Sequence, residues 1–156
     1  MNYFAYGSNL DQVQMGHRCP DAKLTGSAQL TGHQLCFPRH SLVRGCAVAS
    51  VEAHADSVVW GVIYELSDED LTRLDAREGH DPVNPSAVNS YIRIDVSVQQ
   101  SPGKTTKAVT YVAVPDDTQG RPSPDYMAHI IGGALAHGFP SDYVDKLKTI
   151  ETGEDN

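Results

Sequence analysis

The chain has 156 residues, enough for one domain with a hydrophobic core but too few for two domains of ordinary size. Its hydrophobic fraction of 40% excludes general disorder. Its formal charge of −8 argues against binding to nucleic acids or anionic membranes, which require clustered basic side chains. The nearest approach to a basic cluster is Arg39, His40 and Arg44, a pattern typical of a solvated loop, although it could also meet a small anionic substrate.

The three cysteines, Cys19, Cys36 and Cys46, are odd in number and lack the spacing of metal ligands. They argue against a disulfide framework and favour a reducing cytoplasm. His17 beside Cys19 supplies too few ligands for zinc, so we expect no metal. We also expect no secretory leader and no membrane anchor, because no segment has the required pattern or length.

The first predicted element is an aromatic-rich strand at residues 3–6, which stops abruptly at Gly7, Ser8 and Asn9. Backbone N–H groups in such a loop can bind an anion, and Ser8 and Asn9 add a hydroxyl and an amide beside them. An ordinary strand-to-helix turn is the commoner explanation of this pattern.

A short helix is predicted over residues 11–18, capped by Asn9 or Asp11 and ended by Pro20. Three strand-like segments follow, at residues 24–37, 46–51 and 58–66. A glycine inside the third segment, Gly61, predicts a bulge or bend there.

A second short helix is predicted to begin at Ser67, with acidic residues in its first turn and Leu71 and Leu74 on one face. Gly79 ends this helix, and a loop rich in Pro, Asn and Ser follows over residues 80–90. The alternating residues 92–98, the Ser-Pro-Gly-Lys turn and residues 109–114 then predict a β-hairpin.

The last third is predicted to be helical, with Ser123 as the N-cap of one helix and Ser141 at the start of the next. Apolar residues recur at helical spacing in both, namely Met127, Ile130, Ile131, Ala134, Leu135, Tyr143, Val144, Leu147 and Ile150. Gly132 and Gly133 inside the first of these helices predict close packing against a neighbouring element.

Strands therefore dominate the front of the chain and helices the back, without regular strand–helix alternation. This order predicts an α+β fold in which mainly antiparallel strands form a small mixed barrel or curved sheet flanked by short helices. Residues 1–150 are predicted to form the single domain, and residues 151–156 an acidic, flexible tail.

Glu78 is unusual because a carboxylate in the last turn of a helix faces the negative end of the helix dipole. Asp75, a like charge three residues earlier, also favours a raised pKa, and burial would raise the pKa further. A carboxylate with a raised pKa is a better general base near neutral pH. A solvated glutamate, balanced by Arg73 or Arg77, is the commoner explanation of such a residue.

Two other residues are candidates for polar roles in a site. Ser8 lacks the flanking glycines of a nucleophile elbow, so a cap or a ligand donor is a better interpretation than a nucleophile. Tyr126 lies at the edge of the apolar face of its helix, which suits a phenol that reaches a polar partner as well as one in the core.

Taken together, several motifs resemble those of the γ-glutamylcyclotransferase family, and the likeness covers nearly the whole chain. They are Tyr-Phe-Ala-Tyr-Gly-Ser-Asn-Leu at 3–10, Val-Trp-Gly-Val at 59–62, Leu-Asp-Ala-Arg-Glu-Gly at 74–79, Pro-Ser-Pro-Asp-Tyr at 122–126, Ile-Ile-Gly-Gly-Ala at 130–134 and Gly-Phe-Pro at 138–140. The resemblance implies an acyltransferase of glutathione metabolism that needs no cofactor. In this reaction the α-amine of a γ-glutamyl group attacks its own side-chain carbonyl and releases 5-oxoproline and an amine.

The resemblance also assigns roles to residues of this chain. Glu78 matches the family's general acid/base. The segment Tyr3, Phe4, Ala5, Tyr6, Gly7, Ser8 and Asn9 matches the strand and loop that hold the γ-glutamyl group, and Tyr126 and Tyr91 match pocket tyrosines.

Residues 81–89 form a longer segment than is usual for the animal-type enzymes and could cover the pocket. The identity of the amine that is released therefore stays open. The branch that acts on γ-glutamyl-amines carries Tyr-Gly-Thr-Leu, so Tyr-Gly-Ser-Asn-Leu favours the γ-glutamyl-amino-acid type. Two alternatives stay open: removal of a γ-glutamyl protecting group in secondary-metabolite biosynthesis, and a non-catalytic module that binds a γ-glutamyl or carboxylate ligand. The expected partner is a small molecule, and a homodimer is possible.

Overall fold

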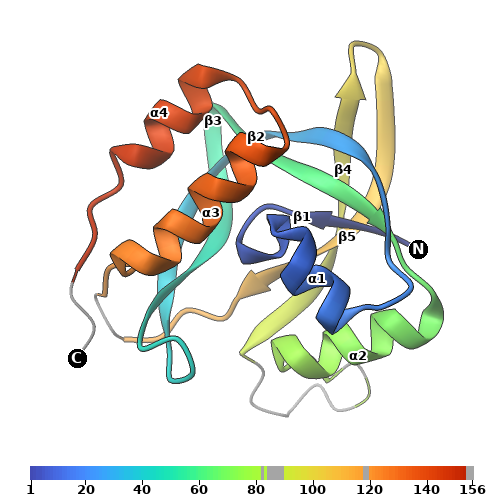
Figure 1. Cartoon of the computed structure of the whole chain (residues 1–156), viewed down its shortest axis with the longest axis horizontal. Helices are drawn as coiled ribbons and strands as arrows, with labels where there is room; N and C mark the ends of the chain where they lie inside the picture. The colour runs from blue at the N-terminus through green and yellow to red at the C-terminus, as the bar shows by residue number, and fades with distance from the viewer. Residues whose placement is uncertain (82, 84–89, 118–119, 154–156) are drawn as a thin grey trace.

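The structure is a computed structural model of the chain and describes residues 1–81, 83, 90–117 and 120–153. Its strands form a closed barrel in the order β1-β3-β2-β4-β5 (Figure 1). Their bounds are β1 Asn2–Ala5, β2 Lys23–Ser41, β3 Cys46–Glu65, β4 Tyr91–Ser101 and β5 Lys104–Ala113. Neighbouring strands pair antiparallel except β1 and β5, which pair in parallel where Tyr3 meets Val109. The predicted α+β class with a mixed barrel is therefore confirmed.

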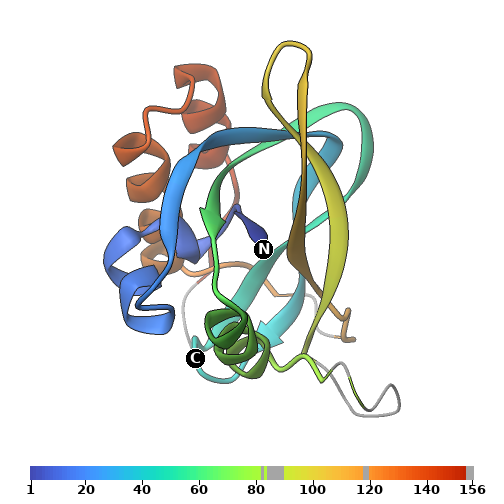
Figure 2. The same ribbon diagram turned by 90° about the vertical axis from the view of Figure 1, so that its right-hand side faces the viewer.

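The helices lie outside the barrel in two groups. They are the 3₁₀ turn η1 Ser8–Leu10 and the α-helices α1 Gln12–Arg18, α2 Asp68–Glu78, α3 Pro124–Ala136 and α4 Ser141–Lys148. Figure 1 shows α3 and α4 together on one side, with α1 and α2 close to each other below them. The β4–β5 hairpin projects beyond the rest of the barrel in the turned view (Figure 2).

The predicted caps begin the helices as expected. Asp11, one of the two predicted candidates, accepts hydrogen bonds from the N–H groups of Val13 and Gln14 at 2.8 and 3.2 Å. Ser67 and Ser123 each accept a hydrogen bond from the N–H group three residues later. At the end of α2, Gly79 has a φ of 74°, a conformation that favours glycine.

Residues 46–51 and 58–66, predicted as two strands, belong to one continuous strand, β3, except for Leu66, which follows its end. The irregularity lies between them, where the partners of β2 jump from Val58, opposite Thr31, to Ala53, opposite His33. Asp56 lies inside this jump with a φ of 66°. The strand therefore bends at residues 54–57 rather than ending there.

The predicted bulge or bend at Gly61 is wrong, because Gly61 pairs in regular register with Ala28. The glycine is required for close packing. A Cβ atom added to Gly61 would lie 2.6 Å from the ring of Phe4, which is fully buried. The absence of a side chain at Gly61 thus leaves room for the Phe4 ring of β1 to pack against β3.

The predicted close packing of α3 holds at one of its two glycines. A Cβ atom at Gly133 would lie 2.6 Å from the Cβ atom of Leu10, whereas one at Gly132 would meet nothing within 4 Å. Leu135, predicted on the apolar face, is 60% exposed, because the helix buries a narrower stripe than the sequence pattern indicates. The contact at Gly133 fixes η1 against α3.

Residues 151–153 lie against the segment that precedes α3. Glu151 forms an ion pair with Arg121 at 3.2 Å, and the N–H group of Gly153 donates to the carbonyl of Pro122 at 3.0 Å. The remaining tail lies outside the described residues, so its flexibility stays a prediction. In the described part of the chain, no helix is long and apolar enough to cross a bilayer.

Candidate active site

A cavity of about 1190 Å³ opens beside the turn that joins β1 to η1. Its walls come from η1, α1, α2, the β2–β3 turn, the start of α3 and all five strands. Of the residues predicted to form a site, those that line the cavity are Tyr3, Tyr6, Gly7, Ser8, Asn9, Glu78, Tyr91 and Tyr126. Residues that are far apart in the sequence thus line one cavity.

Phe4 and Ala5 are the predicted residues that do not line the cavity. Both are fully buried, and the Phe4 ring lies 6.2 Å from the ring of Tyr6, measured between centroids. Their direct contact with a substrate stays a prediction. In the structure their side chains support the strand that leads into the cradle, which is the backbone of Gly7, Ser8 and Asn9.

The first two carbonyl groups of the cradle accept hydrogen bonds within the turn itself. The N–H of Leu10 donates to the carbonyl of Gly7 at 3.0 Å, and the N–H of Asp11 donates to that of Ser8 at 3.1 Å. These hydrogen bonds turn both carbonyl dipoles toward the following residues.

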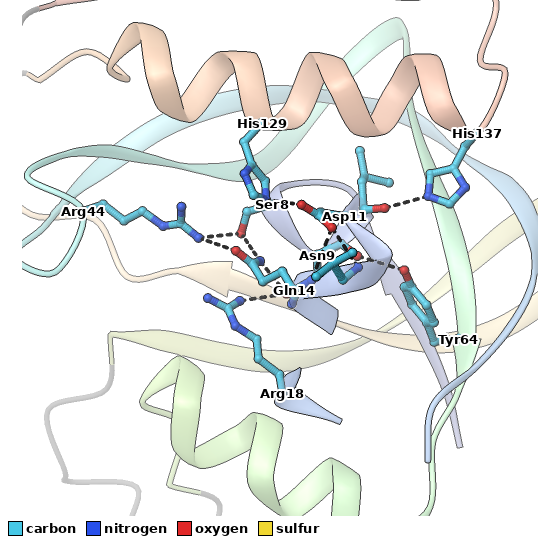
Figure 3. Close-up of polar contacts among 11 residues, drawn as sticks. Ser8, Asn9, Asp11, Gln14, Arg18, Arg44, Tyr64, His129 and His137 are labelled. Carbon is cyan, nitrogen blue, oxygen red and sulfur yellow. Dashed lines mark hydrogen bonds and ion pairs between the residues drawn. The ribbon is translucent and has the colours of Figure 1, made fainter. Parts of the chain in front are cut away.

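Two side chains satisfy the next carbonyl groups (Figure 3). The hydroxyl of Tyr64 donates to the carbonyl of Asn9 at 3.1 Å, and Nε2 of His137 lies 2.7 Å from the carbonyl oxygen of Leu10. Among the described residues, the N–H groups of the cradle have no hydrogen-bond acceptor of their own. Free N–H groups beside a cavity can bind a carboxylate or a developing oxyanion.

The side chain of Ser8 is held by two donors. Nε2 of Gln14 donates to Ser8 Oγ at 2.9 Å, and Nη2 of Arg44 donates to the same atom at 3.1 Å (Figure 3). An oxygen that accepts two hydrogen bonds keeps its own proton for a third partner. No histidine bonds to Ser8 in the described part of the chain, which supports a positioning donor over a nucleophile.

Asn9 is buried and fixed on both ends of its amide. Its Nδ2 donates to the hydroxyl of Tyr3 at 2.9 Å, and its Oδ1 accepts from Arg18 at 2.7 Å and from Gln14 at 3.0 Å. The Asn9 side chain therefore holds the cradle to α1, which carries Gln14 and Arg18.

The carboxyl group of Glu78 has a raised pKa, and burial is the largest cause. The positive charges of Arg18, Arg77 and Arg44 oppose this shift, and so does the amide of Asn9. The predicted direction is thus borne out, but the predicted contribution of Asp75 is not among these causes. A partly buried carboxylate with a raised pKa can accept a proton from a substrate near neutral pH.

Asp75 serves a different purpose on the same helix. Its Oδ1 accepts a hydrogen bond from the hydroxyl of Tyr111 at 2.6 Å, and its Oδ2 forms an ion pair with Arg93. This cluster joins the last turn of α2 to strands β4 and β5. It positions the helix end that carries Glu78.

The cavity tyrosines are kept neutral by their surroundings. Burial raises the pKa of Tyr126 to about 12, and burial together with the charge of Glu78 raises the pKa values of Tyr3 and Tyr91 further. The phenol oxygen of Tyr126 lies 3.8 Å from where a Cβ atom of Gly7 would be. A neutral phenol can donate a proton into a hydrogen bond beside the cradle.

Several lining residues were missed by the sequence reasoning, namely Gln14, His17, Arg18 and Tyr111. No local pattern marks them, since each belongs to an ordinary helix or strand. Arg39, His40 and Arg44, interpreted above as a solvated loop or an anion contact, all line the cavity, which favours the anion contact.

The chemistry of the cavity uses oxygen and nitrogen groups only. Among the described residues, no cluster of three or more His, Cys, Asp or Glu side chains could hold a metal ion. Cys19, Cys36 and Cys46 are free thiols, and burial raises the pKa values of Cys19 and Cys36 to about 11. Those two thiols therefore stay protonated and poorly nucleophilic.

The fold and cavity define a class of small barrel enzymes in which a partly buried carboxylate and the cradle line the same cavity. Comparisons with known proteins give the same result. Residues 58–147 match the model of the AIG2-like family. The γ-glutamylcyclotransferases of human and mouse are each 31% identical to this chain, over 97% of its length and 79% of theirs.

A solved structure of a γ-glutamyl cyclotransferase superposes with a TM-score of 0.87 at 30% identity, covering 99% of this chain and 89% of that one. The chain therefore belongs to the γ-glutamylcyclotransferase family and is an enzyme of the cyclotransferase type.

Proposed function

We propose that the enzyme cyclises the γ-glutamyl group of a γ-glutamyl-amino acid, releasing 5-oxoproline and the free amino acid, with Glu78 as general acid/base. The observation that carries this proposal is the meeting of Glu78 and the free N–H groups of residues 7–9 in one cavity. The human and mouse relatives named γ-glutamylcyclotransferase support the same reaction class.

The reaction needs a base, a folded-back substrate and stabilisation of an oxyanion. The α-ammonium of the substrate loses a proton to Glu78, and the resulting amine attacks the side-chain carbonyl carbon. The new C–N bond closes a five-membered ring, and the oxyanion accepts hydrogen bonds from the cradle. Glu78 then returns its proton to the leaving nitrogen, and the original C–N bond breaks. The ring nitrogen loses its second proton to the solvent, and 5-oxoproline and the amino acid result.

The raised pKa of Glu78 suits both halves of this cycle. A carboxylate with an ordinary pKa is a weak base near neutral pH, and one with a raised pKa takes the ammonium proton more readily. The same carboxylic acid remains acidic enough to protonate an amine that leaves. These steps are redox-neutral, so they require no redox cofactor.

The direct test is incubation with γ-glutamyl-alanine and measurement of 5-oxoproline. Glu78→Gln removes the carboxylate that accepts and returns the proton and should lower kcat by about 10²- to 10⁴-fold. Glu69→Gln, on the same helix with its side chain 81% exposed, is the matched control and should retain the wild-type rate. Saturable binding without product from several γ-glutamyl substrates would instead identify a binding module.

We also propose that the enzyme works in the cytoplasm, in the metabolism of glutathione-derived γ-glutamyl compounds. The three free thiols of the described chain support a reducing compartment. The cavity has the size of a site for small metabolites. The net charge of −8 gives no support to a nucleic-acid partner.

A further inference from the structure

Arg44 connects the tight turn at residues 42–45 to the cradle. Leu42 and Val43 in this turn are 94% and 92% exposed, so apolar packing does little to hold the turn in place. The guanidinium of Arg44 ties it to the cradle instead. Its Nη2 atom donates to Ser8 Oγ at 3.1 Å and to Gln14 Oε1 at 2.9 Å (Figure 3). One nitrogen atom thus bridges a cradle residue and a residue of α1.

The hydroxyl of Ser8 has its direction set by what its two partners lack. Ser8 Oγ accepts from Nε2 of Gln14 at 2.9 Å and from Nη2 of Arg44 at 3.1 Å. Both nitrogen atoms carry hydrogens and offer no lone pair, so neither can accept the Ser8 proton. Among the described residues no other group accepts it. Because Ser8 lines the cavity, its proton is left for an oxygen atom of a substrate.

The orientation of the Gln14 amide depends on Arg44 as well. Its Oε1 accepts from Arg44, while its Nε2 donates to Ser8 Oγ and, at 3.0 Å, to Asn9 Oδ1. Rotation of the amide by half a turn would present Oε1 to Ser8, where it would accept the hydroxyl proton in place of the substrate. A guanidinium can only donate, so it keeps Oε1 on its own side. Arg44 therefore controls both hydrogen bonds that Ser8 Oγ accepts.

We propose that Arg44 is a positioning residue that acts through Ser8. By donating to Ser8 Oγ and by fixing the Gln14 amide, it directs the Ser8 proton toward the substrate oxygen that the cradle binds. This inference rests on the proposed function and adds a side-chain donor to the backbone N–H groups of the cradle. Arg44 lies outside the motifs that carry the family resemblance, so its turn supplies a part of the site that those motifs lack.

A double-mutant cycle tests whether Arg44 acts through Ser8, with kcat/KM for γ-glutamyl-alanine as the readout. Arg44→Met removes the donor and keeps an unbranched side chain, and should cost about 10-fold. Ser8→Ala should cost about 100-fold, the size of one lost oxyanion donor. Adding Arg44→Met to Ser8→Ala should cost less than about threefold more, because the group through which Arg44 acts is gone. Arg44→Lys retains a charged N–H donor and should stay within about threefold of wild type.

A second cycle separates Ser8 from the other contact of Arg44. The guanidinium lies over the ring of Tyr126, 5.2 Å from the ring centroid. Tyr126→Phe keeps this ring, so Arg44→Met should still cost about 10-fold in that background. Arg121→Met is the matched control, since it removes the same charge from a residue outside the cavity and should retain the wild-type rate. Urea denaturation identifies any variant that is slow because it is unfolded.

Three outcomes would overturn the assignment. Equal losses from Arg44→Met in the wild-type and Ser8→Ala backgrounds would show that Arg44 acts on the substrate or on the turn without Ser8. A wild-type rate for Arg44→Met or for Ser8→Ala would show that the directed proton has no role. A loss in Arg44→Lys as large as that in Arg44→Met would exclude donation as its function. Absence of 5-oxoproline with wild-type enzyme would instead refute the proposed function itself.

Discussion

Tyr91 and Tyr126 bind the same backbone residue from opposite sides. The hydroxyl of Tyr91 donates to the carbonyl of Ala49 at 3.0 Å, and the hydroxyl oxygen of Tyr126 accepts from the N–H of Ala49 at 3.0 Å. The first tyrosine uses its proton in this contact and the second does not. Of these two tyrosines, Tyr126 is therefore the one whose proton remains available to a substrate in the cavity.

Tyr126→Phe should slow the chemical step because it removes this donor from the neighbourhood of the cradle. We expect kcat to fall about 100-fold, the size of one lost donor to an oxyanion, with KM little changed. Initial rates of 5-oxoproline release measure the effect. Tyr143→Phe, which removes a phenol from α4 away from the cavity, is the control. Equal losses in both variants would contradict a catalytic role for Tyr126.

The acid side of the pH–rate profile should move when Arg18 is replaced. The charge of Arg18 lowers the pKa of Glu78, so Arg18→Gln should raise that pKa and shift the acid limb of kcat/KM to higher pH. The midpoint of the limb is the readout, because lost contacts to Asn9 change the amplitude as well. Arg121→Gln should leave the midpoint unchanged. A shift to lower pH would exclude Glu78 as the titrating base.

Glu78→Gln should stabilise the folded protein at neutral pH although it abolishes the base. The folded protein holds the Glu78 proton more tightly than the unfolded chain, so stability is lost as pH rises from the ordinary carboxyl pKa of 4.5 through the raised value. The free energy of unfolding of the variant should exceed that of wild type at pH 7, and the difference should vanish below pH 4.5. Urea denaturation at several pH values measures this, with Glu69→Gln as the exposed control.

Gly61→Ala should destabilise the barrel, because the added Cβ atom would lie 2.6 Å from the ring of Phe4. Overpacking of this kind costs about 1–3 kcal/mol of unfolding free energy. Gly16→Ala is the matched control: a Cβ atom there would meet nothing within 4 Å, and the change should stabilise α1 by roughly 0.5–1 kcal/mol. Thermal and urea unfolding report both. A neutral Gly61→Ala would mean that β1 and β3 can separate without loss.

The elements that are set by local chemistry were predictable from the sequence. Ser67 and Ser123 cap their helices because a side-chain oxygen can reach an N–H group three residues later in any context. Gly79 ends α2 for a reason that is equally local. Short motifs also singled out Gly7, Ser8, Asn9 and Glu78, which line one cavity in the structure, and their roles stay predictions.

The parts that depend on tertiary contacts were not predictable. The alternation of β4 predicts a strand but not which face turns inward: Arg93 pairs with Asp75, whereas Ile92 is 40% exposed. Asp75 has this cationic partner, and it is not among the groups that shift the pKa of Glu78. Arg44 reaches the cavity only because the β2–β3 turn folds back toward η1, and no spacing in the sequence encodes that approach.

The parallel contact between Tyr3 and Val109 has a consequence for how the protein folds. It joins residues more than a hundred positions apart, so its formation closes the largest loop in the barrel, and such long-range pairings form slowly. The cradle follows β1 directly, so its position depends on the pairing of β1 with both β3 and β5. Catalytic competence should therefore arise late in folding, with the appearance of activity marking completion of the barrel.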